Sequence, residues 1–185
     1  MHITLILGSV RQNRESAKPA AFIEAKLKEA GHTVNFVDLL DLALPVFDDA
    51  PEQYLLPGAI RLSQAITEAE GIVLVFPEYN HDMGSGLRNA FSYLRKREFS
   101  HRPVGLAAVS NGQYGGVRAL YAAKASLPTL GGIMLPTVVS VDTVQTAFPD
   151  ATTCTNPKIK GAIAGMLKEL AAYGPALTQV RAALA

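Results

Sequence analysis

Apolar runs of strand length alternate with helical patterns along almost the whole chain, and this alternation restricts the fold more than any other feature. Five strands are predicted, at Ile3–Leu7, Thr33–Val37, Gly71–Phe76, Val104–Val109 and Ile133–Val141, the last one interrupted at Pro136. Helices are predicted at Ser16–Ala30, Ala59–Glu70, Leu87–Lys96, Val117–Leu130 and Lys158–Tyr173, and Pro175–Leu184 either extends or restarts the last helix. Continuous apolar strands separated by helices are typical of a parallel sheet that is covered on both faces.

The chain length and the number of strands together narrow the topology. With 185 residues the chain can bury one full core, and no linker or internal repeat divides it, so we expect a single α/β domain over residues 1–185. Right-handed crossovers leave few arrangements for five parallel strands, and the flavodoxin-like order 2-1-3-4-5 fits them best. The Pro- and Asp-rich stretch 39–58 is too irregular to assign.

The composition excludes several classes of function. The 17 basic and 16 acidic side chains give a net charge of +1, which argues against a nucleic-acid or membrane-surface partner. Cys154 is the only cysteine, so an internal disulfide and a cysteine metal cluster are excluded, and the histidines lack zinc-site spacing. The chain shows neither a signal-peptide pattern nor an apolar stretch of bilayer length, so we expect a cytoplasmic protein.

The loop after the first predicted strand has the composition of a phosphate site. It reads Gly8-Ser9-Val10-Arg11-Gln12-Asn13-Arg14-Glu15-Ser16 and leads directly into a helix. The hydroxyls of Ser9 and Ser16 and the backbone N–H groups donate to phosphate oxygens, and Arg11 adds a charge-assisted contact. The positive end of the helix dipole strengthens the site. Arg14 either contacts the phosphate as well or faces water.

Two further polar loops follow the third and fourth predicted strands. They contain Pro77-Glu78-Tyr79-Asn80 and Ser110-Asn111-Gly112-Gln113-Tyr114-Gly115-Gly116. Because ligands of open α/β sheets bind outside the carboxyl ends of the strands, all three loops are expected to meet at one edge. A glycine-rich backbone approaches a flat ring closely, and Tyr79 and Asn80 are placed to contact its edges or faces. A phosphate joined to a planar heterocycle fits FMN.

The same motifs resemble those of the NADPH-dependent FMN reductase family, which includes quinone, azo-dye and chromate reductases. The matching residues are Gly8-Ser9-x-Arg11-x-x-x-x-Ser16, Pro77-Glu78-Tyr79-Asn80 and Ser110-x-Gly112-x-x-Gly115-Gly116-x-Arg118-Ala119, so the resemblance covers about the first 140 residues. It implies a flavodoxin-like fold with non-covalent FMN, the phosphate on Ser9, Arg11 and Ser16. It also implies a homodimer or homotetramer with the flavin near a subunit interface. The chain departs from the family at Gly84-Ser85-Gly86, where a proline is common, and a looser loop is expected there.

The candidate cofactor-binding residues come from all three loops, and no catalytic side chain or metal ligand is assigned. They are Ser9, Arg11, Arg14, Ser16, Pro77, Glu78, Tyr79, Asn80, Ser110, Asn111, Gly112, Gln113 and Gly115. Glu78 is expected to hold backbone or an arginine, and ordinary packing is an alternative for Tyr79. His81 is expected in solvent, with the nicotinamide pocket as the alternative. The acidic residues of the 39–58 stretch are expected in solvent, with Mg²⁺ binding as the alternative, and Cys154 has no nucleophile motif.

The predicted activity is that of an FMN-dependent NAD(P)H oxidoreductase. Hydride passes from the nicotinamide to flavin N5, and two electrons then reduce a quinone, azo compound, metal oxyanion or flavin. Arg14, Arg88 and Arg118 are the candidates for distinguishing NADPH from NADH. The alternative is a flavodoxin-type electron carrier without turnover, which Arg11 and the near-zero net charge disfavour. The chain has no G-x-G-x-x-G turn after the first strand and no P-loop sequence, which argues against those nucleotide-binding classes.

Overall fold

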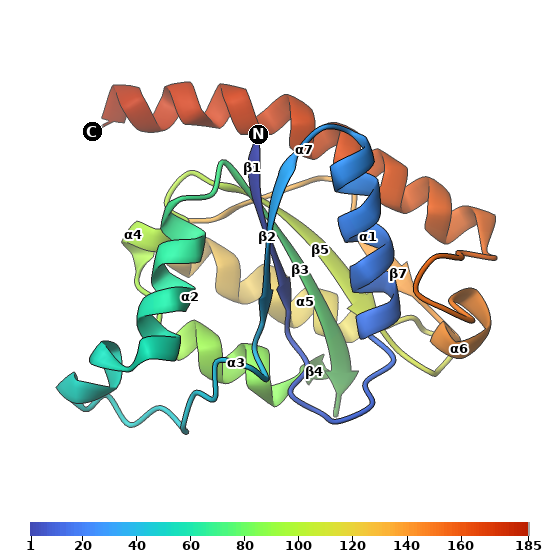
Figure 1. Cartoon of the computed structure of the whole chain (residues 1–185), viewed down its shortest axis with the longest axis horizontal. Helices are drawn as coiled ribbons and strands as arrows, with labels where there is room; N and C mark the ends of the chain where they lie inside the picture. Colours follow the sequence, from blue (N-terminus) through green and yellow to red (C-terminus); the bar gives the residue numbers. More distant parts are fainter. Residues whose placement is uncertain (185) are drawn as a thin grey trace.

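A computed structural model describes residues 1–184 and contains one central sheet with helices on both faces (Figure 1). Its strands are β1 (His2–Leu7), β2 (Thr33–Asp38), β3 (Gly71–Tyr79), β4 (Asp82–Met83), β5 (Pro103–Val109), β6 (Ile133–Met134) and β7 (Val139–Val141). They are ordered β2-β1-β3-β5-β6, with β7 also beside β5 and β4 beside β3. The β3–β4 pair is antiparallel and the other pairs are parallel.

The helices form two layers. They are α1 (Ala17–Glu29), α2 (Pro57–Thr67), α3 (Ser85–Ser92), α4 (Lys96–Phe99), α5 (Val117–Ser126), α6 (Val144–Ala147) and α7 (Pro157–Leu184), with short 3₁₀ turns η1 (Pro51–Leu55) and η2 (Leu127–Leu130). The helices α2, α3, α4 and α5 pack on Ile72, Leu74 and Phe76 of β3. The helices α1, α6 and α7 pack on the opposite face, which includes Val73 and Val75. Alternate side chains of each strand therefore enter different cores, as the apolar runs predicted.

The doubly wound α/β arrangement is confirmed, but the description as five strands is wrong in two places. The predicted fifth strand, Ile133–Val141, is divided into β6 and β7, which pair with β5 at Pro103 and at Ala107 respectively. Pro136 lies in the gap and has no N–H to donate to a ladder. The other difference is β4, a strand too short to give a periodic signal in the sequence.

Several predicted boundaries also move. The strand β3 continues past Phe76 to Tyr79 because Pro77 pairs with Val109 and Glu78 pairs with Met83. The Pro-Glu-Tyr part of the tetrapeptide is therefore strand and not loop. The predicted helix Val117–Leu130 ends at Ser126, and η2 follows it.

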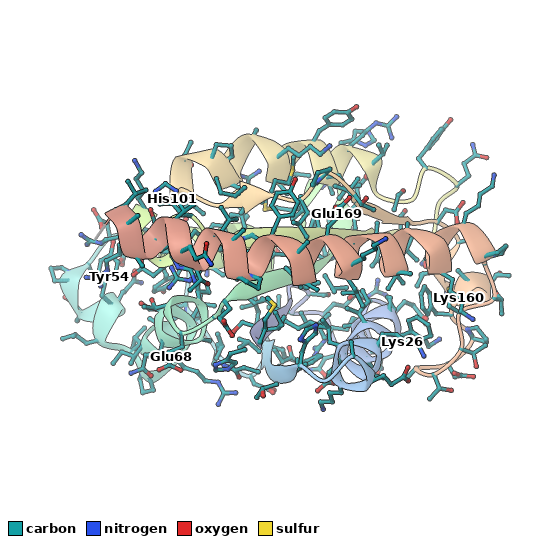
Figure 2. All side chains as sticks on the ribbon, turned by 90° about the horizontal axis from the view of Figure 1, so that it is seen from above. Lys26, Tyr54, Glu68, His101, Lys160 and Glu169 are labelled. Carbon is teal, nitrogen blue, oxygen red and sulfur yellow. The ribbon has the colours of Figure 1, made fainter. Side chains whose placement is uncertain are left out.

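The last helix, α7, is continuous from Pro157 to Leu184 although it contains Pro175, so the second segment extends the first. Figure 1 shows it along the top of the molecule, and Figure 2, seen from above, shows it crossing between α5 and α1. Glu169 of α7 accepts hydrogen bonds from the backbone N–H (2.8 Å) and the hydroxyl (2.6 Å) of Thr137, in the gap between β6 and β7. Within residues 1–184, no helix combines the length and the apolar content needed to cross a bilayer.

Candidate functional site

A cavity of about 330 Å³ lies at the carboxyl ends of β1, β3 and β5. Figure 1 shows these strands running away from the C-terminal half of α7. It brings together predicted residues from all three loops, namely Ser9, Arg11, Arg14, Ser16, Pro77, Glu78, Tyr79, Ser110, Asn111 and Gly112. Three predicted residues, Asn80, Gln113 and Gly115, lie outside its lining. The carboxyl-end rule therefore located the cavity, although it did not fix the role of every loop residue.

The first loop is held close to β3 and α3 by two glycines. The Gly8 N–H donates to the Val75 carbonyl at 2.8 Å, and a Cβ on Gly8 would lie 3.1 Å from the Cβ atoms of both Leu87 and Phe76. A Cβ on Gly86 would lie 2.6 Å from a methyl carbon of Val10. These close approaches fix the path of the loop over the start of α3.

Arg14 does not face water. Its side chain is only 13% exposed, Nη1 donates to the Arg11 carbonyl at 3.3 Å, and Nη2 pairs with Asp38 at the end of β2. Its Nε is buried and has no hydrogen-bond partner among the described residues. The guanidinium is therefore held on two sides and keeps one buried N–H without a partner among the described residues, on a residue that lines the cavity.

Ser16 carries the second unsatisfied donor of this loop. The residue is 3% exposed and occupies the N-cap position of α1, but its hydroxyl makes no capping bond and has no partner among the described residues. The hydroxyl therefore does not act as the capping acceptor of α1 in this structure. Because buried polar groups are normally paired, two orphaned donors in one cavity suit an anion with several acceptor oxygens.

The other polar groups of the first loop differ in exposure. Arg11 is exposed, and Ser9 is 2% exposed, with its Oγ 3.4 Å from the Arg11 N–H that donates to it. Glu15 also lines the cavity, but Lys18 pairs with its carboxylate at 2.7 Å. This ion pair offsets the negative charge of Glu15 next to the orphaned donors.

Asn80 and His81 form the turn between β3 and β4. Their φ angles are 50° and 65°, and Tyr79 pairs directly with Asp82, so this is a two-residue hairpin with the geometry of a type I′ turn. Asparagine tolerates this left-handed backbone better than most residues. Asn80 therefore allows the tight turn to form, and it lines a neighbouring hollow and not the cavity.

The loop after this turn is not loosened by the absence of a proline. The Gly84 N–H donates to the Pro77 carbonyl at 3.0 Å, a bond that a proline at this position cannot make. Tyr79 lines the cavity and is 39% exposed, so it is not an ordinary buried packing residue.

His81→Gly is expected to stabilise the protein by about 0.5–1 kcal/mol. Glycine removes the strain of a left-handed backbone, about 1–2 kcal/mol, but it loses more conformational entropy on folding than histidine does, which offsets part of this gain. The measurement is the midpoint of thermal unfolding. His32→Gly is the control, because the φ of His32 is not positive, and we expect it to be destabilising. A lower midpoint for His81→Gly would show that the imidazole contributes more than its backbone costs.

The third loop is held by hydrogen bonds between its backbone and two serine hydroxyls, one of them on β7. The Gly112 N–H donates to Ser110 Oγ at 3.0 Å, and the Gly115 carbonyl accepts from Ser140 Oγ at 2.8 Å. A Cβ on Gly115 would lie 2.2 Å from that hydroxyl oxygen, so glycine is needed there for packing against β7. Gln113 is exposed and outside the cavity.

Sequence reasoning missed five residues of the lining: Asn13, Glu15, Val109, Val144 and Gln145. The first three lie in or next to segments that the motifs already contained. Val144 and Gln145 belong to α6, which begins shortly after β7 ends. These two residues could have been predicted from the end of the last predicted strand, because the segment that follows a parallel strand begins at the carboxyl edge of the sheet, where the cavity lies.

The other candidate residues are the two arginines Arg88 and Arg118, which contact neighbouring side chains, and the half-buried Cys154. Arg88 pairs with Asp82 at 2.6 Å and donates to Ser126 at 2.9 Å, while Arg118 lies over the Tyr114 ring at 5.2 Å. Burial raises the pKa of the Cys154 thiol, which works against a reactive thiolate. No group of three or more metal-ligating side chains occurs in residues 1–184.

Together the fold and the cavity define a doubly wound α/β protein with a polar cavity at the carboxyl edge of its sheet. The family model described as NADPH-dependent FMN reductase matches residues 1–146, and the chain belongs to this family. An NADPH azoreductase from a Bacillus species is 33% identical over 147 residues, covering 78% of this chain and 80% of that protein. A quinone reductase from Escherichia coli is 27% identical over 140 residues, covering 73% of each.

The comparison with solved structures identifies the fold as flavodoxin-like, because a flavodoxin from Streptococcus pneumoniae matches 93% of this chain and 99% of its own with a TM-score of 0.59 and 12% identity. The flavoenzyme NAD(P)H:acceptor oxidoreductase FerB from Paracoccus denitrificans superposes with a TM-score of 0.73 and 19% identity. The match covers 96% of this chain and 97% of that one, so it extends into α7, which lies beyond the family match. At this level of identity the similarity concerns the fold alone.

Proposed function

We propose that this protein binds FMN in the cavity at the carboxyl ends of β1, β3 and β5 and transfers electrons from NAD(P)H to a small-molecule acceptor. The observation that carries the proposal is the pair of buried, unpartnered donors in the first loop, Arg14 Nε and Ser16 Oγ. Family membership supports FMN as the cofactor and NAD(P)H as the donor. A quinone, an azo compound, a metal oxyanion or a flavin is the proposed acceptor.

Each wall of the cavity has its own part in this proposal. Arg14, Ser16, Ser9 and the exposed Arg11 hold the phosphate. Pro77 and Tyr79 on one side and the 110–112 segment on the other provide the walls for the ring system. Because the Arg11 carbonyl and Asp38 hold the Arg14 guanidinium before any ligand arrives, binding does not have to order that side chain.

When bound, FMN supplies the two-electron chemistry, accepting hydride from the nicotinamide and passing the electrons to the acceptor. The protein's own residues then bind and orient, and no side chain needs to hold or move a proton. Tyr79, at the rim and partly exposed, is placed to contact a substrate that enters beside the ring. We assign no catalytic acid or base.

The proposed activity predicts a specific sequence of colour changes. After incubation with FMN, the purified protein should show a flavin absorbance spectrum. In the absence of oxygen, NADPH or NADH should bleach this spectrum, and addition of a quinone should restore it. A flavodoxin-type carrier, the alternative function, would show almost no steady-state NADPH oxidation. Protein that remains colourless after incubation with FMN and gel filtration would contradict the proposal.

A homodimer or homotetramer remains a prediction that follows from the family resemblance. The exposed face of α5 carries large apolar side chains, with Tyr121 68% and Val117 38% exposed, and Tyr114 just before the helix is 60% exposed. Exposed apolar side chains that gather on one face are typical of interaction sites. Light scattering of the purified protein measures the assembly directly.

A further inference from the structure

One side chain of the cavity lining, that of Glu78, contacts the start of α5, 40 residues further along the chain. Glu78, near the end of β3, has a side chain that is only 12% exposed. Its Oε2 accepts hydrogen bonds from the backbone N–H groups of Arg118 (3.1 Å) and Ala119 (3.3 Å), in the first turn of α5. The expectation that Glu78 holds backbone is therefore confirmed.

The helix α5 has no means of its own to satisfy these groups. Its N-cap residue is Gly116, which has no side chain, and its first turn contains no acidic residue. A carboxylate that accepts from two N–H groups at a helix start is a strong, charge-assisted cap and interacts favourably with the helix dipole. Glu78 thus supplies the missing cap from a neighbouring strand.

The charges that face the Glu78 carboxylate are few and mostly exposed. Arg118 Nη1 lies 4.0 Å from Oε1, on a side chain that is 46% exposed. His81 Nδ1 lies 3.5 Å from Oε1, on a side chain that is 69% exposed. Solvent screens both partners, so neither of these two side chains offsets much of the negative charge of the carboxylate.

We propose that Glu78 is a positioning residue that fixes the start of α5 against β3. It thereby determines the distance between the two walls of the ring site, Pro77 and Tyr79 on one side and the 110–112 segment on the other. Its charge also acts on a bound flavin. The second part rests on the proposed function. A negative charge next to the ring disfavours the addition of electrons. Glu78 also neutralises the helix end that would otherwise favour the reduced, anionic flavin.

Two variants separate the shape of the site from its charge. Glu78→Gln keeps an acceptor oxygen at the same length but removes the charge, so we expect the midpoint potential of bound FMN to shift to a more positive value. Its FMN dissociation constant should stay within about threefold, since the cap persists. Glu78→Ala removes the cap, and we expect FMN affinity to fall by about tenfold or more.

Hydrogen exchange of the ligand-free protein tests the structural part alone. The amides of Arg118 and Ala119 should exchange about tenfold or more faster in Glu78→Ala than in the native sequence. Glu169→Gln is the control, because Glu169 also accepts a backbone N–H but lies on α7 (Figure 2) and does not line the cavity. It should change neither these amides nor the FMN potential.

The outcomes distinguish this inference from the proposed function. Unchanged amide exchange in Glu78→Ala would overturn the inference whether or not FMN binds. An unchanged potential in Glu78→Gln would overturn the claim that the carboxylate charge acts on the flavin. Failure of the native protein to bind FMN would overturn the proposed function, and with it the redox part of the inference.

Discussion

Gly116→Ala is expected to destabilise the protein by about 2–5 kcal/mol. Gly116 has a φ of 76°, and an L side chain in the left-handed region costs about 1–2 kcal/mol. The new Cβ would also lie 2.8 Å from the Ala108 Cβ and 3.3 Å from the Val109 backbone nitrogen, inside the buried strand β5. Overpacking of this kind costs about 1–3 kcal/mol more. Chemical denaturation monitored by circular dichroism measures the loss.

Gly161→Ala is the matched control for that substitution. Gly161 is exposed on α7, and a Cβ there meets no atom within 4 Å. Alanine in a helix interior is more stable than glycine by about 0.5–1 kcal/mol, so this variant should be more stable than the native protein. If Gly116→Ala matched the stability of the native protein, the close packing of the third loop on β5 would be refuted.

Ser16→Ala should have opposite effects on the ligand-free and the FMN-bound protein. Without ligand, the variant loses a buried hydroxyl that has no partner, so its stability should be unchanged or higher by up to about 1–3 kcal/mol. With FMN, it loses a hydrogen bond to a charged group worth about 1.5–3 kcal/mol, so the dissociation constant should rise about 10–150-fold. Fluorescence titration with FMN and thermal unfolding measure the two effects.

Two comparisons make this test specific for the phosphate. Riboflavin lacks the phosphate, so its affinity should be the same for Ser16→Ala and the native protein. Ser63 lies on α2, outside the cavity lining, and its hydroxyl donates to Glu98 at 3.1 Å. Ser63→Ala should therefore lower the stability of the protein without changing its affinity for FMN. An equal loss of affinity for riboflavin and FMN would mean that Ser16 does not contact the phosphate.

The parts of the fold that the sequence predicted depend on local patterns. Apolar runs such as Gly71–Phe76 identify buried strands because parallel strands are covered on both faces. The position of the three loops then follows from the direction of the strands, without knowledge of any side-chain contact. For the same reason Ser9, Ser16 and Tyr79 were found as lining residues.

The parts that were missed depend on contacts between distant segments. The ion pair of Arg14 with Asp38 needs the end of β2 to lie beside the first loop, and no spacing in the sequence encodes it. The type I′ turn was missed because His81 stands where glycine is usual. Asn80 was therefore interpreted as a ligand contact, although its residue type also suits a left-handed backbone.

The divided strand at one edge of the sheet has a consequence for the behaviour of the protein at high concentration. An unbroken edge strand offers a row of free backbone groups that a second molecule can extend into a shared sheet. Here β6 has two residues and β7 has three, and the gap between them contains Pro136 and the Thr137 amide bound by Glu169. This edge is a poor template for intermolecular strand addition, so we expect any strand-to-strand association to occur at the opposite edge, where β2 is an unbroken strand of six residues.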